Sequence, residues 1–159
     1  MAFNKPSKKK VAFPVSNTLN KYLTKYNRST KLPIHYEDLN ARQIAAVPLL
    51  DFNGNDTFWE TVYFSELETK EIHIALEKIY ALLKTDGDFS VLDHLQVARI
   101  DYCTFGNTKP YRIRIINQIN DNYDHFYIKK MDASRIYGLE LEHLLSPSSL
   151  RNKHYSKNF

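Results

Sequence analysis

Two adjacent lysines and a later glutamate are the residues with the clearest potential for chemistry. Lys129 and Lys130 stand near the end of the apolar stretch HFYIKKM, and Glu140 follows in the next predicted helix. A lysine ammonium can hold a phosphate, and a carboxylate beside it can fix its position without removing its charge. One interpretation of these residues is therefore phosphate binding. The other interpretation is a solvated strand end whose lysines discourage edge-to-edge pairing.

Three predicted strands must position these lysines. Residues 98–105 and 111–117 alternate β-branched and aromatic residues with polar ones, and residues 125–131 form the third strand. A turn that contains Gly106 joins the first two strands, and a polar run joins the second to the third. Alternation in the third strand puts Lys130 and Lys129 on opposite faces.

A helix follows the third strand, and its spacing indicates which glutamate points inward. Asp132 or Ser134 is expected to cap the helix, which should end before Pro147 because the residue before a proline disfavours helix. Glu140 shares a face with apolar residues of this helix, whereas Glu142 lies on a more exposed side.

This order of elements, over residues 99–145, resembles the nucleotide-binding N-terminal lobe of the protein-kinase-like fold, as found in bacterial proteins with a kinase-like body. The resemblance implies that Lys130 meets the phosphates of ATP, with Lys129 as the alternative, and that Glu140 holds the lysine. It also implies that the Gly106 turn covers the phosphates. An apolar residue two positions before Lys130 would then pack on the adenine, which favours Lys130.

The chain departs from that family in its glycines and its length. The turn has one glycine where the kinase loop has several, and the lysine-to-glutamate spacing is short. The residues after Lys130 contain no catalytic-loop aspartate or asparagine and no Asp-Phe-Gly-like metal site. The expectation is a truncated lobe that binds nucleotide without transferring phosphate alone, and that requires a missing second lobe or a protein partner.

The N-terminal half is predicted to be mainly helical. Ser16 should cap a helix that runs to about Arg28, with Leu19, Leu23 and Tyr26 on its inner face. Asn53-Gly54 predicts a β-hairpin between residues 49–52 and 58–64, because both residues tolerate positive φ.

The clearest helix begins after Ser65, which forms a capping box with Glu68. Asp86-Gly87 should end this helix. Its apolar stripe is Leu67, Ile72, Leu76, Ile79 and Leu83, and a shorter helix is expected over residues 90–95.

Composition supplies an alternative function: a small basic α+β interaction module that binds protein or single-stranded nucleic acid and has no catalytic chemistry. The 159 residues carry a net charge of +4, with a pI near 9.0, which suits an acidic partner. Basic and aromatic residues could form a platform for single-stranded nucleic acid, diluted by Asp101, Asp121 and Asp124. The platform residues would be Lys109, Arg112, Arg114, Lys129 and Lys130, with Tyr102, Tyr111 and Tyr127.

The sequence thus predicts an α+β fold: a mainly helical N-terminal half with a β-hairpin, then a three-stranded antiparallel sheet and a C-terminal helix. Residues 1–15 are expected to be a flexible basic terminus, 16–146 one domain and 147–159 a polar tail. No membrane segment is evident, so the cytoplasm is expected. ATP is the one cofactor predicted and no metal site is recognised. Cys103 is the only cysteine, which excludes an internal disulfide.

Overall fold

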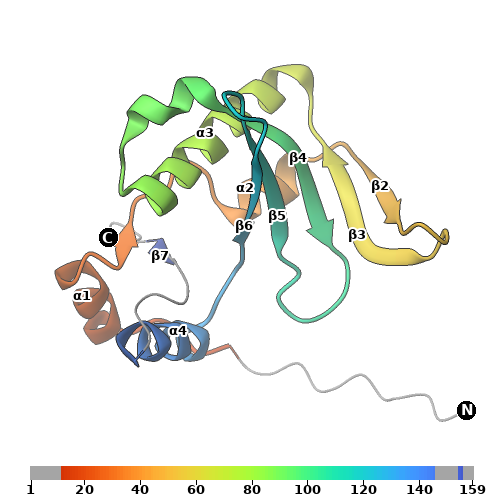
Figure 1. Cartoon of the computed structure of the whole chain (residues 1–159). Helices are drawn as coiled ribbons and strands as arrows, with labels where there is room; N and C mark the ends of the chain where they lie inside the picture. Colours follow the sequence, from red (N-terminus) through yellow and green to blue (C-terminus); the bar gives the residue numbers. More distant parts are fainter. Residues whose placement is uncertain (1–11, 146–153, 156–159) are drawn as a thin grey trace, which may run out of the picture.

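A five-stranded antiparallel sheet forms the centre of the protein (Figure 1). The computed structural model describes residues 12–145 and 154–155. Neighbouring strands pair in chain order, so the sheet is a meander. Its strands are β2 (Ala45–Leu50), β3 (Asp56–Tyr63), β4 (Leu95–Cys103), β5 (Tyr111–Asn117) and β6 (Tyr123–Ile128).

The prediction of a separate three-stranded sheet was therefore wrong. The Asn53-Gly54 hairpin does form, as β2 and β3, but Trp59 to Thr61 of β3 also pair with Asp101 to Cys103 of β4. A two-stranded hairpin is marginal alone and becomes stable when it joins a larger sheet. The N-terminal half consequently contributes two strands to the central sheet and is not mainly helical.

Helix α3 (Glu66–Thr85) covers one face of the sheet (Figure 1). Ser65 caps it by accepting a hydrogen bond from the Glu68 amide, as predicted. It ends at Asp86, which adopts left-handed backbone with φ 53°, and Gly87 follows at φ 94°. Of the predicted stripe, Ile72, Leu76 and Ile79 are buried, whereas Leu67 is exposed.

The main core lies between this helix and the sheet, and helix α2 (Tyr36–Arg42) also contributes to it through Leu39. The 3-10 helix η1 (Phe89–His94) leads from α3 into β4. The most deeply buried apolar side chains of β4 and β5 are Val97 and Ile100 in β4, and Tyr111, Ile113 and Ile115 in β5.

A second, smaller cluster joins the two ends of the described chain. Helix α1 (Asn17–Lys25), capped by Ser16 as predicted, buries Leu19 and Leu23 against Ala133 and Ile136 of helix α4 (Ala133–Leu145). Tyr26, predicted to face inward, is exposed. Asp132 accepts a hydrogen bond from the Arg135 amide at the start of α4, which agrees with the predicted cap.

Strand β1 (Ser29–Thr30) pairs in parallel with β7 (His154–Tyr155), so part of the predicted polar tail is a strand. The expectations for residues 1–11, 146–153 and 156–159 lie outside the described residues. Within the described ranges, no helix has the length and apolar character needed to cross a membrane.

Candidate functional site: the open face of the sheet

The lysines and the glutamate singled out in the sequence do not meet. Lys130 lies just beyond β6, where its Nζ is 2.7 Å from a carboxylate oxygen of Glu37, and both side chains are exposed. Glu140 is buried on α4. Its carboxylate accepts from Arg28 Nε at 2.9 Å and is 2.8 Å from His154 Nε2.

Those contacts account for the inward position of Glu140. Burial acts to raise its pKa, but the hydrogen bonds from Arg28 and His154 prevail and leave that pKa below its usual range. The lysine–glutamate pair that the kinase-like interpretation requires is thus replaced by two separate ion pairs. The interpretation itself stays a prediction.

Gly106 and Lys129 do lie at one end of the sheet, because Tyr111 after the turn pairs with Ile128 before the lysines. Gly106 adopts φ 89°, which favours glycine, and no heavy atom lies within 4 Å of the position a Cβ would take. Lys129 is exposed. The described residues contain no group of three or more His, Cys, Asp or Glu side chains arranged for a metal ion.

The side of the sheet opposite α3 carries a different set of residues. Strand alternation points these side chains away from the core, and none of them belongs to either apolar cluster of the described chain. We call this surface the open face. Its central residues are Trp59 and Thr61 of β3, Arg99, Asp101 and Cys103 of β4, Arg112, Arg114 and Ile116 of β5, and Tyr123, His125 and Tyr127 of β6.

Strand register arranges these residues in rows across the sheet. One row runs Thr61, Asp101, Arg112, Tyr127, and the next runs Arg99, Arg114, His125. A register irregularity between Val97 and Arg99 brings Arg99 opposite Arg114, because β4 has one extra residue there. Basic and aromatic side chains are therefore direct cross-strand neighbours.

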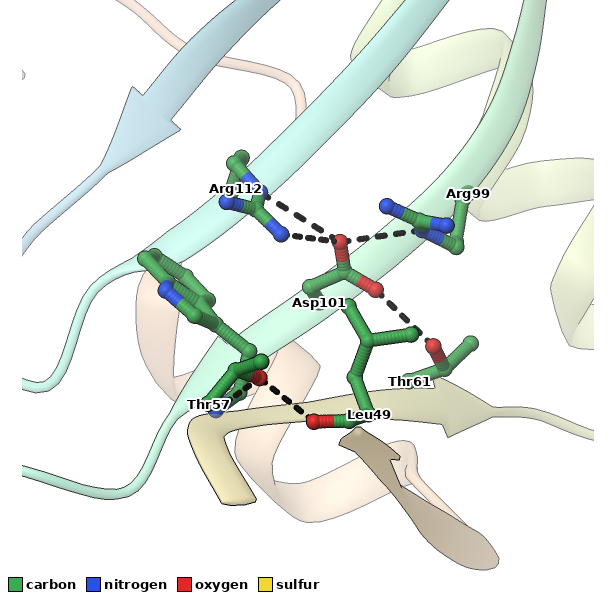
Figure 2. A network of polar contacts seen from close by, with 7 residues as sticks. Leu49, Thr57, Thr61, Arg99, Asp101 and Arg112 are labelled. Atoms are coloured by element: carbon green, nitrogen blue, oxygen red, sulfur yellow. Dashed lines mark hydrogen bonds and ion pairs between the residues drawn. The ribbon is translucent and has the colours of Figure 1, made fainter. Parts of the chain in front are cut away.

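Asp101 organises the first row, as Figure 2 shows. Its side chain is 1% exposed, and one oxygen accepts from Arg99 Nε at 3.0 Å and from Arg112 Nη2 at 3.0 Å. The other oxygen accepts from the Thr61 hydroxyl at 2.9 Å. One carboxylate thus holds two guanidinium groups in place and neutralises only one of their charges.

Aromatic rings lie against the arginines. The Arg112 guanidinium carbon is 4.1 Å from the centre of the Trp59 ring, and the Arg114 guanidinium carbon is 4.1 Å from the centre of the Tyr123 ring. The Trp59 and Tyr127 rings are 6.5 Å apart. Such stacking favours cations electrostatically and leaves flat guanidinium and ring surfaces on the sheet.

Electrostatics in the second row disfavour a further positive charge. Burial lowers the pKa of His125, and the guanidinium groups of Arg112, Arg114 and Arg99 lower it further, while Asp124 opposes them. The carboxylate of Asp124 is itself engaged by Tyr80 and Lys84, on α3. Burial and the three guanidinium groups therefore favour the neutral form of His125.

Two tyrosines of the predicted platform face the core and not the open face. Tyr111 is completely buried and its hydroxyl donates to Asn40, and Tyr102 packs against the same core. Tyr36 joins them, and burial followed by interactions with Tyr102 raises the pKa of Tyr36 to about 12. Arg112, Arg114 and Tyr127 do lie on the open face.

The sequence interpretation missed Trp59, Arg99, Tyr123 and His125. A signal existed: Arg99-x-Asp101 and Arg112-x-Arg114 each place two charges on one face of a strand, and the intervening turn makes the two strands neighbours. Comparison of the chain with protein-family models, curated proteins and solved structures finds no match.

Proposed function

We propose that the open face binds single-stranded nucleic acid, with bases stacked on its aromatic rings and guanidinium planes and with its arginines attracting the backbone. Arginines interleaved with aromatic rings on an exposed sheet surface are the observation that carries this proposal. Unpaired bases stack on both kinds of flat group, and phosphates supply the negative charge that the excess guanidinium charge requires.

Asp101 supports this proposal because it holds an arginine of the open face in a fixed position before a ligand binds. Arginine side chains are flexible, and ordering them on binding costs side-chain entropy. Because Asp101 and Trp59 already fix Arg112, less of that cost remains when a ligand arrives. The charges present favour an anionic, aromatic ligand over an apolar protein surface.

Anisotropy of a labelled single-stranded oligonucleotide tests the proposal, with Tyr127→Ala as the variant. Loss of one stacking ring should weaken binding by about 1–3 kcal/mol, or about fivefold or more. Tyr137→Ala on α4 is a matched control, because Tyr127 is 53% exposed and Tyr137 is 54% exposed. Equal effects of the two substitutions would count against the proposal, as would equal binding of a duplex.

Mg-ATP belongs in the same experiment as a competing ligand. The kinase-like interpretation predicts that Mg-ATP raises the melting temperature and that Lys130→Ala removes this effect. The open-face proposal predicts that Lys130→Ala leaves oligonucleotide affinity close to that of the wild type, because Lys130 is paired with Glu37 away from the rows.

A further inference from the structure

The second row of the open face contains two buried nitrogens without a hydrogen-bond partner. Arg114 Nε and His125 Nε2 are both covered, and neither has a partner among the described residues. The two residues are direct cross-strand neighbours in β5 and β6. A buried polar nitrogen left without a partner costs about 1–3 kcal/mol, so a ligand oxygen that reached both nitrogens would be stabilising.

Charge indicates what that group is. Arg99, Arg112 and Arg114 bring three guanidinium groups to the centre of this face. Asp101 is the one carboxylate in the two rows, and it already accepts hydrogen bonds from Thr61, Arg99 and Arg112. Arg114 therefore has a ring beneath it but no counter-charge among the described residues of the open face.

We propose that Arg99, Arg114 and His125 form a binding site for one phosphate group of the single strand. This inference rests on the proposed function and adds the chemical group that the second row recognises. An arginine fork presents Nε and a terminal nitrogen together, a geometry that matches two phosphate oxygens. His125 Nε2 beside it can donate a third hydrogen bond.

Tyr123 gives the site an orientation. Its ring lies against Arg114 and its centre is 5.7 Å from that of His125, at the edge of the row. A phosphate held by Arg114 and His125 would place the attached nucleoside near Tyr123 on one side. The next nucleoside, on the other side of the phosphate, would lie near Tyr127 and Trp59. Tyr127 is two residues further along β6 than His125, and Trp59 lies across the sheet on β3.

Proton linkage gives the site a measurable signature. His125 is faced by Arg112 and Arg114 from β5 and by Arg99 from β4, with Asp124 beside it on β6. A bound anion offsets the guanidinium charges and favours the imidazolium form. Binding should therefore take up a proton, and affinity should rise as pH falls, by up to about tenfold for each unit of pKa change.

Sulfate is the first probe, because its charge is constant across this pH range and it carries no base. NMR pH titrations of the wild-type protein at increasing sulfate concentrations should show an upward shift in the His125 pKa that saturates. The exposed His94, at the end of η1 and outside the two rows, is an internal control that should not respond. Arg114→Lys keeps the charge but removes the fork, and should weaken sulfate binding severalfold.

Oligonucleotides with and without a 5′-phosphate then identify the source of the phosphate. A gain from the 5′-phosphate assigns the site to a strand end, and equal affinity assigns it to the backbone. In both cases affinity should rise between about pH 7.5 and about pH 5.5 in the wild type and stay flat in His125→Gln. His94→Gln should behave like the wild type.

The outcomes separate the two proposals. If oligonucleotides bind but sulfate leaves His125 unchanged and His125→Gln keeps the wild-type pH profile, the phosphate site is wrong and the open-face function stands. If sulfate shifts His125 but no oligonucleotide binds, the anion site stands and the proposed function fails. A sulfate response that does not saturate, or that is equal at His94, overturns the site.

Discussion

Replacing Asp101 with asparagine should have opposite effects on stability and on binding. The carboxylate is buried and accepts hydrogen bonds from Thr61, Arg99 and Arg112. Asparagine keeps the size and one acceptor oxygen but removes the charge. Two guanidinium groups then lose their counter-charge while they remain on the open face.

The stability cost can be worked from these contacts. Removing one partner of a fully buried ion pair costs about 3–5 kcal/mol. The side chains of Arg99 and Arg112 are 31% and 20% exposed, so water recovers part of that loss. We expect the free energy of unfolding to fall by about 2 kcal/mol, or a melting temperature lower by about 4–8 °C for a chain of this length.

Oligonucleotide affinity should rise in the same variant, because the Asp101 carboxylate no longer competes with phosphates for Arg99 and Arg112. The asparagine oxygen and the Trp59 ring still hold Arg112 in part, so the charge gained is expected to outweigh the ordering lost. If one or two released guanidinium groups reach phosphates, each added contact makes the slope of log affinity against log salt steeper by about 0.7. Denaturant unfolding and anisotropy at several salt concentrations measure both quantities. Unfolding should be easier while binding becomes tighter and more salt-dependent.

Glu140→Gln is the matched control for Asp101→Asn. Glu140 is also a buried carboxylate held by an arginine, Arg28, but it lies on α4 and is not part of the open face. Its substitution should destabilise the protein without changing affinity or salt slope. If Asp101→Asn instead leaves binding unchanged, or weakens it in proportion to lost stability, the arginines of the open face do not engage the ligand.

Two further predictions concern residues away from the open face. Burial lowers the pKa of His154 despite its hydrogen bond to Glu140. The folded protein therefore favours the neutral imidazole, and the stability that this neutral ring contributes is complete above about pH 6.5. That stability is lost as the pH falls toward the lowered pKa of the folded state. The melting temperature should therefore fall on acidification from about pH 7.5 to about pH 5.5, less so in His154→Gln, and an unaltered slope would contradict this. Tyr111→Phe should cost about 1 kcal/mol by removing the bond to Asn40 while leaving oligonucleotide binding intact; reduced affinity with unchanged unfolding would place Tyr111 in the binding surface after all.

Local signals in the sequence predicted local structure well. Ser16, Ser65 and Asp86 mark helix ends through interactions with nearby backbone, and Asn53-Gly54 marks a turn through its own φ preferences. Such features depend on a few adjacent residues.

Contacts between distant segments determine which strands and which charged residues are neighbours, and local signals in the sequence do not predict them. The join between β3 and β4 brings Trp59 and Thr61 beside Cys103 and Asp101, and nothing within either segment specifies that partner. The same applies to Glu140, whose helical position correctly indicated an inward side chain. Its partners Arg28 and His154 come from distant segments, so the inward position was assigned to the wrong ion pair.

The central claim is that bases stack on the open face, and Trp59 reports on it directly. Trp59 is the only tryptophan of the chain, so all tryptophan emission comes from this surface. Titration with a single-stranded oligonucleotide should quench that emission along the same binding curve as anisotropy, whereas polyphosphate, which has charge without bases, should bind without comparable quenching. Oligonucleotide binding that leaves Trp59 emission unchanged would contradict the account.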